Sequence, residues 1–213
     1  MEITWYGLSC FRLTERGSAS VVTDPYPDDY GYILPRPRGR VVTVSCNHPM
    51  RNAVKAVRGP SKVLDGPGEY EIGSVFITGV AIVGAKKRTA PPCRNIIFVF
   101  ESNGLTVCHL GSLKHVPSQS QIEALGTVNV LLTPIGGKEL ISTAQAAEVI
   151  SMLEPKLVIP MHYQAPPGKL RLPLVTTFLK EMGADKVESV ESLKVTHSTL
   201  PKETQLVLLN PQQ

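Results

Sequence analysis

Short apolar runs separated by polar and turn-forming residues divide the chain into a β-rich first half and a second half that alternates helix and strand. In the first half, the runs are bounded by Gly, Pro, Asn or Asp, which predicts strands at 2–6, 11–13, 19–23, 41–44, 69–72, 75–83, 96–101 and 105–108. Asn103 and Gly104, between the last two runs, suit the positive φ angles of a tight hairpin turn.

The second half carries helix-start signals. Ser118 with Gln121, and Ser142 with Gln145, have the spacing of a capping box, in which two side chains satisfy free amides at a helix N-terminus. A third helix is predicted to end at Gly183, with its buried face formed by Leu174, Phe178, Leu179 and Met182. Buried strands are predicted at 128–132 and 156–159, and a final β pair at 194–196 and 205–208. This order of elements predicts an α/β fold.

Composition agrees with one globular domain over residues 1–213. The chain is 42% hydrophobic and 19% charged, which allows a sizeable core. Its apolar runs fall short of the roughly 18 to 20 residues of a membrane helix, so we expect no membrane association. The four cysteines, at 10, 46, 93 and 108, form no Cys-x-x-Cys pair, and the first residues show no signal core. We therefore expect a cytoplasmic protein with reduced thiols.

The net charge of +4 is spread along the chain, with the densest basic groups at Arg36, Arg38 and Arg40 and at 86–88. Both groups lie beside Pro or Gly in predicted loops, without the interleaved aromatic residues that stack on nucleobases. We expect these cations to face solvent and predict no nucleic-acid partner.

Residues that could take part in catalysis or metal binding follow predicted strands. Cys46 and His48 follow the strand at 41–44, His109 and Ser112 follow 105–108, and His162 follows 156–159. Ligands of layered α/β proteins bind beyond the carboxyl ends of strands, so these loops are expected to share a pocket. Asp24, before Pro25, is expected to shape a loop near it. Gly136 and Gly137 followed by Lys138 match only part of a phosphate-binding loop and are interpreted as a turn.

The stretch Ser45-Cys46-Asn47-His48-Pro49-Met50-Arg51 resembles the His-x-His-x-Asp-His motif of the metallo-β-lactamase superfamily. Other segments resemble its predicted zinc-dependent hydrolases, relatives of the ascorbate-6-phosphate lactonases; they are residues 3–11, 23–25, 67–73, 109–112 and 159–163. The resemblance covers almost the whole chain. It implies a four-layer αββα sandwich with a metal site at one edge of the packed sheets.

Carried over position by position, most of the implied metal ligands are replaced. Cys46 stands for the first histidine, His48 is unchanged, and Met50 and Arg51 stand for the aspartate and last histidine. Ser112 replaces the bridging aspartate, His162 is retained, and Leu8 stands where the family shows a histidine. No histidine occurs near Val83, where a third ligand is implied. A unit charge on Arg51 about 4 Å from a dication would cost on the order of 8 kcal/mol at an effective dielectric of about 20.

These replacements predict a pocket lined by Leu8, Cys46, His48, Met50, Arg51, Ser112 and His162. We expect its dinuclear site to be largely lost, with no resident cofactor, and the protein to be a non-catalytic binding or scaffold protein. The alternatives are a weak mononuclear hydrolase with zinc on Cys46, His48 and His162, or a thiol-dependent hydrolase using Cys46.

Arg51 is the candidate anion-binding residue, because a guanidinium binds phosphate or carboxylate in a bidentate way. A small anionic ligand is therefore the expected partner. The competing interpretation is that the Arg51 side chain extends into solvent. The sequence leaves the oligomeric state open.

Overall fold

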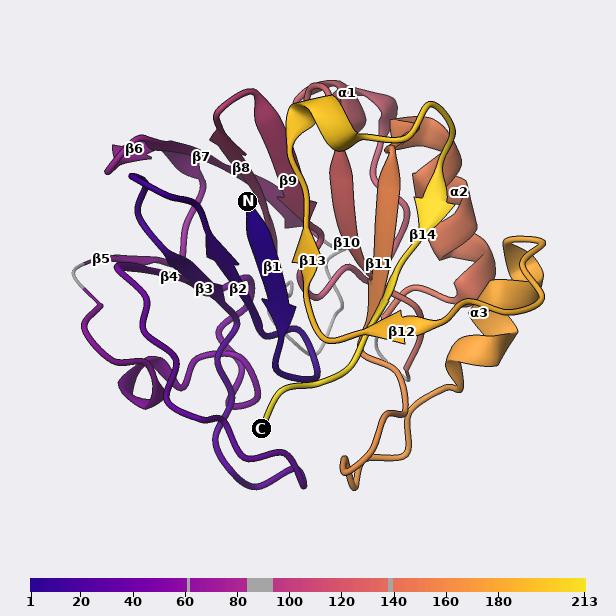
Figure 1. Cartoon of the computed structure of the whole chain (residues 1–213), viewed down its shortest axis with the longest axis horizontal. Coiled ribbons are helices and arrows are strands. Elements are labelled where there is room, and N and C mark those ends of the chain that lie inside the picture. The colour runs from indigo at the N-terminus through magenta and orange to yellow at the C-terminus, as the bar shows by residue number, and fades with distance from the viewer. Residues whose placement is uncertain (61, 84–93, 138–139) are drawn as a thin grey trace.

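Two large β-sheets packed against each other form the centre of the chain, and two helices lie outside the second sheet (Figure 1). The computed structural model describes residues 1–60, 62–83, 94–137 and 140–213. The basic group expected at 86–88, Cys93 and Lys138 lie outside these residues.

The first sheet has six strands in the order β13-β1-β2-β3-β4-β5. They are β1 (Glu2–Trp5), β2 (Phe11–Thr14), β3 (Val21–Thr23), β4 (Val41–Thr43), β5 (Lys62–Leu64) and β13 (Leu193–Lys194). Neighbours β3, β4 and β5 are parallel, whereas β1, β2 and β3 pair antiparallel. The carboxyl ends of β3 and β4 therefore meet at one edge.

The second sheet has seven strands in the order β14-β11-β10-β9-β8-β7-β6. They are β6 (Gly68–Ile72), β7 (Val75–Val83), β8 (Arg94–Ser102), β9 (Leu105–His109), β10 (Val130–Pro134), β11 (Leu157–Met161) and β14 (Gln205–Leu206). Strands β9, β10 and β11 are parallel, and the predicted hairpin turn at Asn103-Gly104 joins β8 to β9. A small third sheet pairs β12 (Ser189–Val190) with β15 (Leu208–Leu209).

The helices confirm the capping signals. Helices α1 (Gln119–Glu123) and α2 (Thr143–Leu153) begin after Ser118 and Ser142, and both capping boxes are formed. Helix α2 ends at Glu154, which has a left-handed φ of 46° and directly precedes Pro155. Helix α3 (Val175–Glu181) packs beside α2, and Figure 1 shows both outside the seven-stranded sheet.

Two apolar clusters correspond to the layers of the sandwich. The larger joins inward residues of both sheets, such as Trp5 and Phe98, and continues to α2 and α3. The smaller lies on the other face of the six-stranded sheet, where Val22 and Val42 pack with Tyr26 and Tyr32. Alternation along the strands explains the division, since Val21 and Val41 belong to the first cluster and their neighbours to the second. The α/β sandwich is confirmed; the layer over the six-stranded sheet consists of irregular chain with the 3-10 turn η1 (Val54–Ala56).

Three details differ from the sequence predictions. Leu174, placed on the buried face of the third helix, is 60% exposed because the helix begins only after it. The final β pair was wrong, since β13 joins β1 and β14 joins β11, in different sheets. Strand β5 was not predicted, because it is three residues long and only Leu64 in it is buried.

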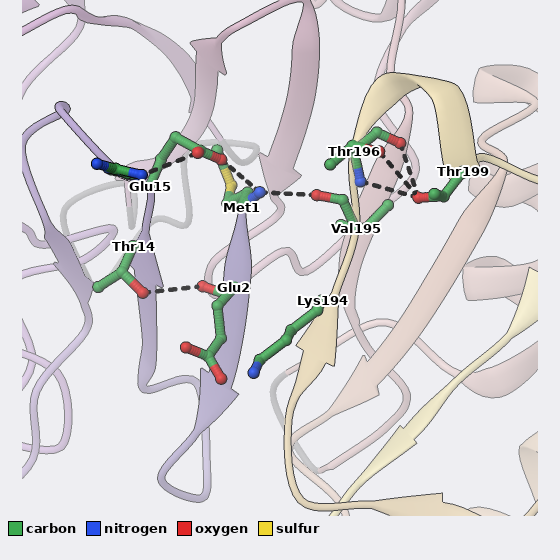
Figure 2. Close-up of a pocket in the computed structure, with 9 residues that line it drawn as sticks. Met1, Glu2, Thr14, Glu15, Lys194, Val195, Thr196 and Thr199 are labelled. Carbon is green, nitrogen blue, oxygen red and sulfur yellow. Dashed lines mark hydrogen bonds and ion pairs between the residues drawn. The ribbon is translucent and has the colours of Figure 1, made fainter.

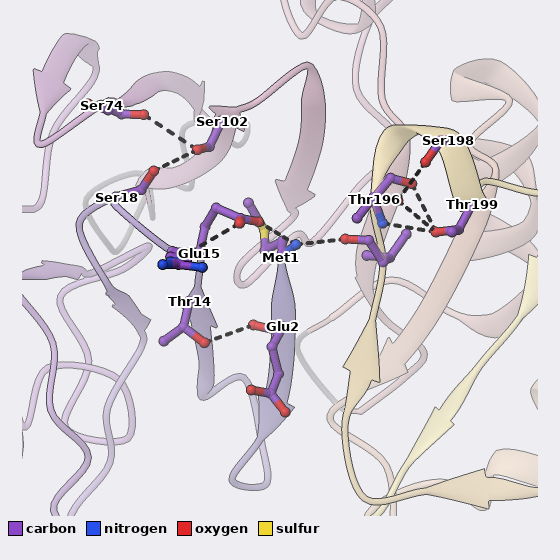
Figure 3. A network of polar contacts seen from close by, with 12 residues as sticks. Met1, Glu2, Thr14, Glu15, Ser18, Ser74, Ser102, Thr196, Ser198 and Thr199 are labelled. Carbon is purple, nitrogen blue, oxygen red and sulfur yellow. Dashed lines mark hydrogen bonds and ion pairs between the residues drawn. The ribbon is translucent and has the colours of Figure 1, made fainter.

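Contacts made by the first residues of the chain lie at the edge of the six-stranded sheet that is opposite the predicted pocket. The Met1 amine donates to the Val195 carbonyl at 2.7 Å and pairs with Glu15, and the Ser18 and Ser102 hydroxyls lie 3.1 Å apart. Figure 3 shows Met1 beside Glu15, and Ser18 beside Ser102. Among the helices that the structure describes, none combines the length and apolar character needed to cross a bilayer.

Candidate functional site

Loops that carry several of the predicted pocket residues lie at one edge of the sandwich, beyond the carboxyl ends of strands from both sheets. Asp24 follows β3 and the 45–51 loop follows β4, whereas Ser112 and His162 follow β9 and β11. Two backbone bonds connect the sheets here, from Ile96 N to Ser45 O at 2.8 Å and from His162 N to Leu8 O at 3.1 Å.

Asp24 is the buried carboxylate of this edge. It is 1% exposed and accepts hydrogen bonds from the Ser45 amide at 2.7 Å and the Ser45 hydroxyl at 2.6 Å. Burial raises the pKa of Asp24, and the nearby charges of His109 and Arg51 and the bonds from Ser45 oppose that rise. The loop-shaping role expected for Asp24 fits these bonds, because they fix the start of the 45–51 loop.

Ser112 is held by Asn95, which sequence reasoning missed. The Asn95 side-chain oxygen accepts from the Ser112 amide at 2.7 Å, and its amide group donates to the Leu110 carbonyl at 2.9 Å. The Ser112 hydroxyl lies 3.5 Å from that of Ser45. The available signal was a polar Asn at the head of the apolar run 96–100, where a buried amide needs partners.

Arg51 points into the protein, which excludes the solvent-facing interpretation. Its side chain is 8% exposed, and its Nη2 lies 3.4 Å from Nε2 of His162. Burial and the Arg51 charge lower the pKa of His162 to about 4, so the ring is neutral near pH 7 and Nε2 can accept a hydrogen bond. Nε of Arg51 and Nδ1 of His162 are buried without a hydrogen-bond partner among the residues described.

Three residues at this edge hold left-handed backbone that non-glycine residues seldom adopt. They are Leu8, Asp24 and His162, with φ of 50°, 40° and 59°. Such conformations cost on the order of 1–3 kcal/mol each and cluster at functional sites. The strained backbone therefore marks this edge of the sandwich as a candidate functional site.

The motif residues Cys46, His48 and Met50 form a tight turn above Arg51. His48 is exposed, its Nδ1 accepts from the Met50 amide at 3.2 Å, and its carbonyl accepts from the Arg51 amide at 2.8 Å. Cys46 is half-buried, and Met50 packs against the smaller apolar cluster, which includes Leu8. The turn thus directs His48 outward while Arg51 points inward.

His109, at the end of β9, has a structural role. It is fully buried, its Nε2 donates to the Ser9 carbonyl at 3.0 Å, and its ring meets Phe11 edge-on. Burial lowers its pKa. This bond ties β9 to the loop after β1.

No group of three or more His, Cys, Asp or Glu side chains is placed to hold a metal ion within the described parts of the chain. Cys46, His48 and His162 therefore do not form a three-donor group. The pairs that do approach are Arg51 with His162, and Ser45 with Ser112 and Asp24.

A hollow of about 620 Å³ lies at the other end of β1 (Figure 2). It is lined by Met1, Glu2, Thr14, Glu15, Arg16, Lys194, Val195, Thr196 and Thr199. Its labelled polar groups largely bond to one another, as between the Thr196 amide and the Thr199 hydroxyl at 2.9 Å. None of the predicted site residues lines it.

Two packed sheets with converging loops at one edge define a metallo-β-lactamase-type fold. The family described as the beta-lactamase superfamily domain matches residues 2–162, and the chain belongs to this superfamily.

Similar proteins include a UPF0173 protein of Pyrococcus furiosus, 30% identical over 76% of this chain and 83% of that protein. A UPF0173 metal-dependent hydrolase of Anaeromyxobacter sp. is 27% identical over 76% of this chain and 74% of its own. A crystal structure of a predicted Zn-dependent hydrolase of the superfamily from Thermotoga maritima aligns with a TM-score of 0.80 and 38% identity, covering 98% of both chains. The superfamily resemblance of the sequence is thus confirmed.

Proposed function

We propose that this chain is a non-catalytic binding or scaffold protein of the metallo-β-lactamase fold, whose loop edge binds a small anion through Arg51. The observation that carries the proposal is the buried guanidinium beside His162, with Nη2 3.4 Å from Nε2. A buried guanidinium requires acceptors, and the neutral ring of His162 supplies one without supplying negative charge. A bound anion would supply both a hydrogen-bond acceptor and a negative charge to the Arg51 guanidinium.

The donors at this edge do not fit the two-metal centre implied by the family resemblance. The Nε2 lone pair of His162 faces a permanent cation, and a metal ion at that nitrogen would be repelled by Arg51. Ser112, in the position of the bridging aspartate, is a neutral hydroxyl whose amide is bound to Asn95. Relatives carry the name metal-dependent hydrolase, whereas in this chain a buried guanidinium lies beside His162.

Asp24 limits what the anion can be. Its carboxylate lies near Arg51 and is fixed by Ser45, so part of the Arg51 charge is already balanced. A ligand that bears one or two negative charges and has oxygen atoms for the guanidinium fork fits this balance, as phosphate or a carboxylate does. The Ser112 hydroxyl can donate to such a ligand, whereas the Ser45 hydroxyl donates its proton to Asp24.

Metal content tests the proposal most directly. Protein purified without chelator or affinity-tag metal is expected to contain well under one zinc, iron or manganese per chain, because a catalytic zinc needs at least three protein ligands. Elemental analysis measures this. A content close to one metal, lost on both Cys46→Ala and His162→Ala, would instead establish the mononuclear alternative.

Turnover assays on the same purified protein distinguish the two enzyme alternatives. Turnover of lactones, phosphodiesters or thioesters that a chelator abolishes selects the metal hydrolase. Turnover that survives chelation but ends when Cys46 is alkylated selects the thiol-dependent hydrolase. Background rates with all these substrates agree with a binding protein.

Anion binding at Arg51 is measurable by thermal unfolding. At about ten times Kd, phosphate or sulfate is expected to raise the melting temperature of the wild type by about 3 °C. This rise should be smaller in Arg51→Ala and in Arg51→Lys, which keeps the charge but loses the fork. Arg16→Ala removes an exposed arginine elsewhere and is the control. Equal responses of all four proteins at matched ionic strength would reject an anion site at Arg51.

A further inference from the structure

A second basic feature lies at the amino ends of β3, β4 and β5, away from the Arg51 edge. A hollow of about 420 Å³ is lined by Ser20, Arg38, Gly39, Arg40, Arg58 and Gly59. Three of the six lining residues are arginines, and no carboxylate lines it.

Backbone contacts bring the arginines together. Residues Arg38 and Arg58 form an isolated parallel β-bridge, so their side chains leave the chain side by side. Nε of Arg58 donates to the Arg36 carbonyl at 2.8 Å, and Nε of Arg12 donates to the Arg38 carbonyl at 2.9 Å. The bond at Nε anchors the Arg58 guanidinium and leaves its two terminal nitrogens for another acceptor.

Two of the three arginines that line this hollow, Arg38 and Arg58, are the candidate anion-binding side chains. Neither Arg38 nor Arg58 has an ion pair with a carboxylate among the residues that the structure describes. The Ser20 hydroxyl accepts from the Arg40 amide at 3.3 Å, which leaves its own proton for donation. Guanidinium forks and a hydroxyl donor form the usual set for a phosphoryl group.

We infer that this hollow binds a small phosphorylated molecule. Its volume lies within the range of small-ligand sites, about 300 to 1,000 Å³. The lining contains no aromatic side chain on which a base could stack, which favours a small ligand over nucleic acid. Gly59 leaves space beside the arginines, since a Cβ built there would meet nothing within 4 Å.

The two anion sites are separate. Strands β3 and β4 run from Ser20 and Arg40 at the hollow to Asp24 and Ser45 at the Arg51 edge. Four residues of extended chain span about 13 Å. The arginine hollow is therefore independent of the function proposed for Arg51, and either can fail alone.

An NMR titration with inorganic phosphate and with glycerol 3-phosphate tests the hollow. The amide signals of Gly39 and Gly59 are expected to shift with both probes. The dissociation constant should be lower for glycerol 3-phosphate than for inorganic phosphate. Arg38→Ala and Arg58→Ala should each weaken binding about tenfold or more, since each removes a charge-assisted contact. Arg58→Lys should weaken it less, and Arg16→Ala and Arg51→Ala should leave these shifts unchanged.

Three results would overturn the inference. The first is binding in Arg38→Ala and Arg58→Ala equal to that of the wild type. The second is an equal loss in Arg16→Ala, which would indicate net charge alone. The third is an oligonucleotide that displaces glycerol 3-phosphate at lower concentration and with the same arginine dependence, which would make the hollow a polyanion site.

Discussion

Asp24→Ala is expected to lower the free energy of unfolding by about 3–5 kcal/mol, which would remove a large part of the stability of an ordinary domain. The carboxylate is 1% exposed and accepts from both the amide and the hydroxyl of Ser45. Its loss leaves the Ser45 amide buried without a partner and leaves the Ser45 hydroxyl only the Ser112 hydroxyl, 3.5 Å away. It also leaves the Arg51 charge less compensated. Urea unfolding followed by circular dichroism measures the change.

Two further variants separate the causes. Asp24→Asn keeps an oxygen acceptor but removes the charge, so its loss of stability should be smaller than that of alanine. Asp65→Ala, at an exposed position after β5, is the matched control and should stay within about 0.5 kcal/mol of the wild type. A loss below about 1 kcal/mol for Asp24→Ala would show that Asp24 does not organise this edge.

Gly111→Ala is the second change with a large expected effect, about 3 kcal/mol of destabilisation. Gly111 has φ of 61°, and a Cβ there would lie 2.4 Å from Cβ of Ser45 and 2.7 Å from Oδ1 of Asn95. These atoms belong to well-buried residues, so the junction between the sheets would have to open.

Gly126→Ala supplies a matched control for backbone strain. Gly126 has φ of 65°, and a Cβ there would meet nothing within 4 Å. It should cost only about 1 kcal/mol, the cost of left-handed backbone with a side chain. Equal midpoints of denaturant unfolding for the two variants would contradict close contact at Gly111. The Gly111 variant should also weaken the response to phosphate through Arg51.

Local sequence signals predicted most of the fold. The capping boxes at Ser118 and Ser142 formed as predicted, because both partners of each box are three residues apart. Strands β7 and β10 formed at the predicted apolar runs, because the spacing of apolar residues that predicts a buried strand is set by residues near one another in the sequence. Strand β5 and the pairing of β14 were missed because short, half-exposed strands are chosen by their neighbours in the sheet.

The candidate site was only partly predictable. Its loops were found because chemically capable residues follow strands. The superfamily was suggested by the resemblance of the 45–51 stretch and of further segments to known family motifs. The role of Asn95 was missed, because a single polar residue beside an apolar run does not reveal that it will bind Ser112, 17 positions away.

The sequence by itself predicted most of the strands, the three helices and the superfamily. The tertiary structure alone decided that Arg51 turns inward to His162, 111 positions away, while His48 turns outward. It also decided that Arg58 joins Arg38 in a basic hollow. The physical reason is that the spacing of apolar residues and helix capping depend on residues near one another in the sequence. The burial of a charge depends instead on which distant strands supply its hydrogen-bond acceptors.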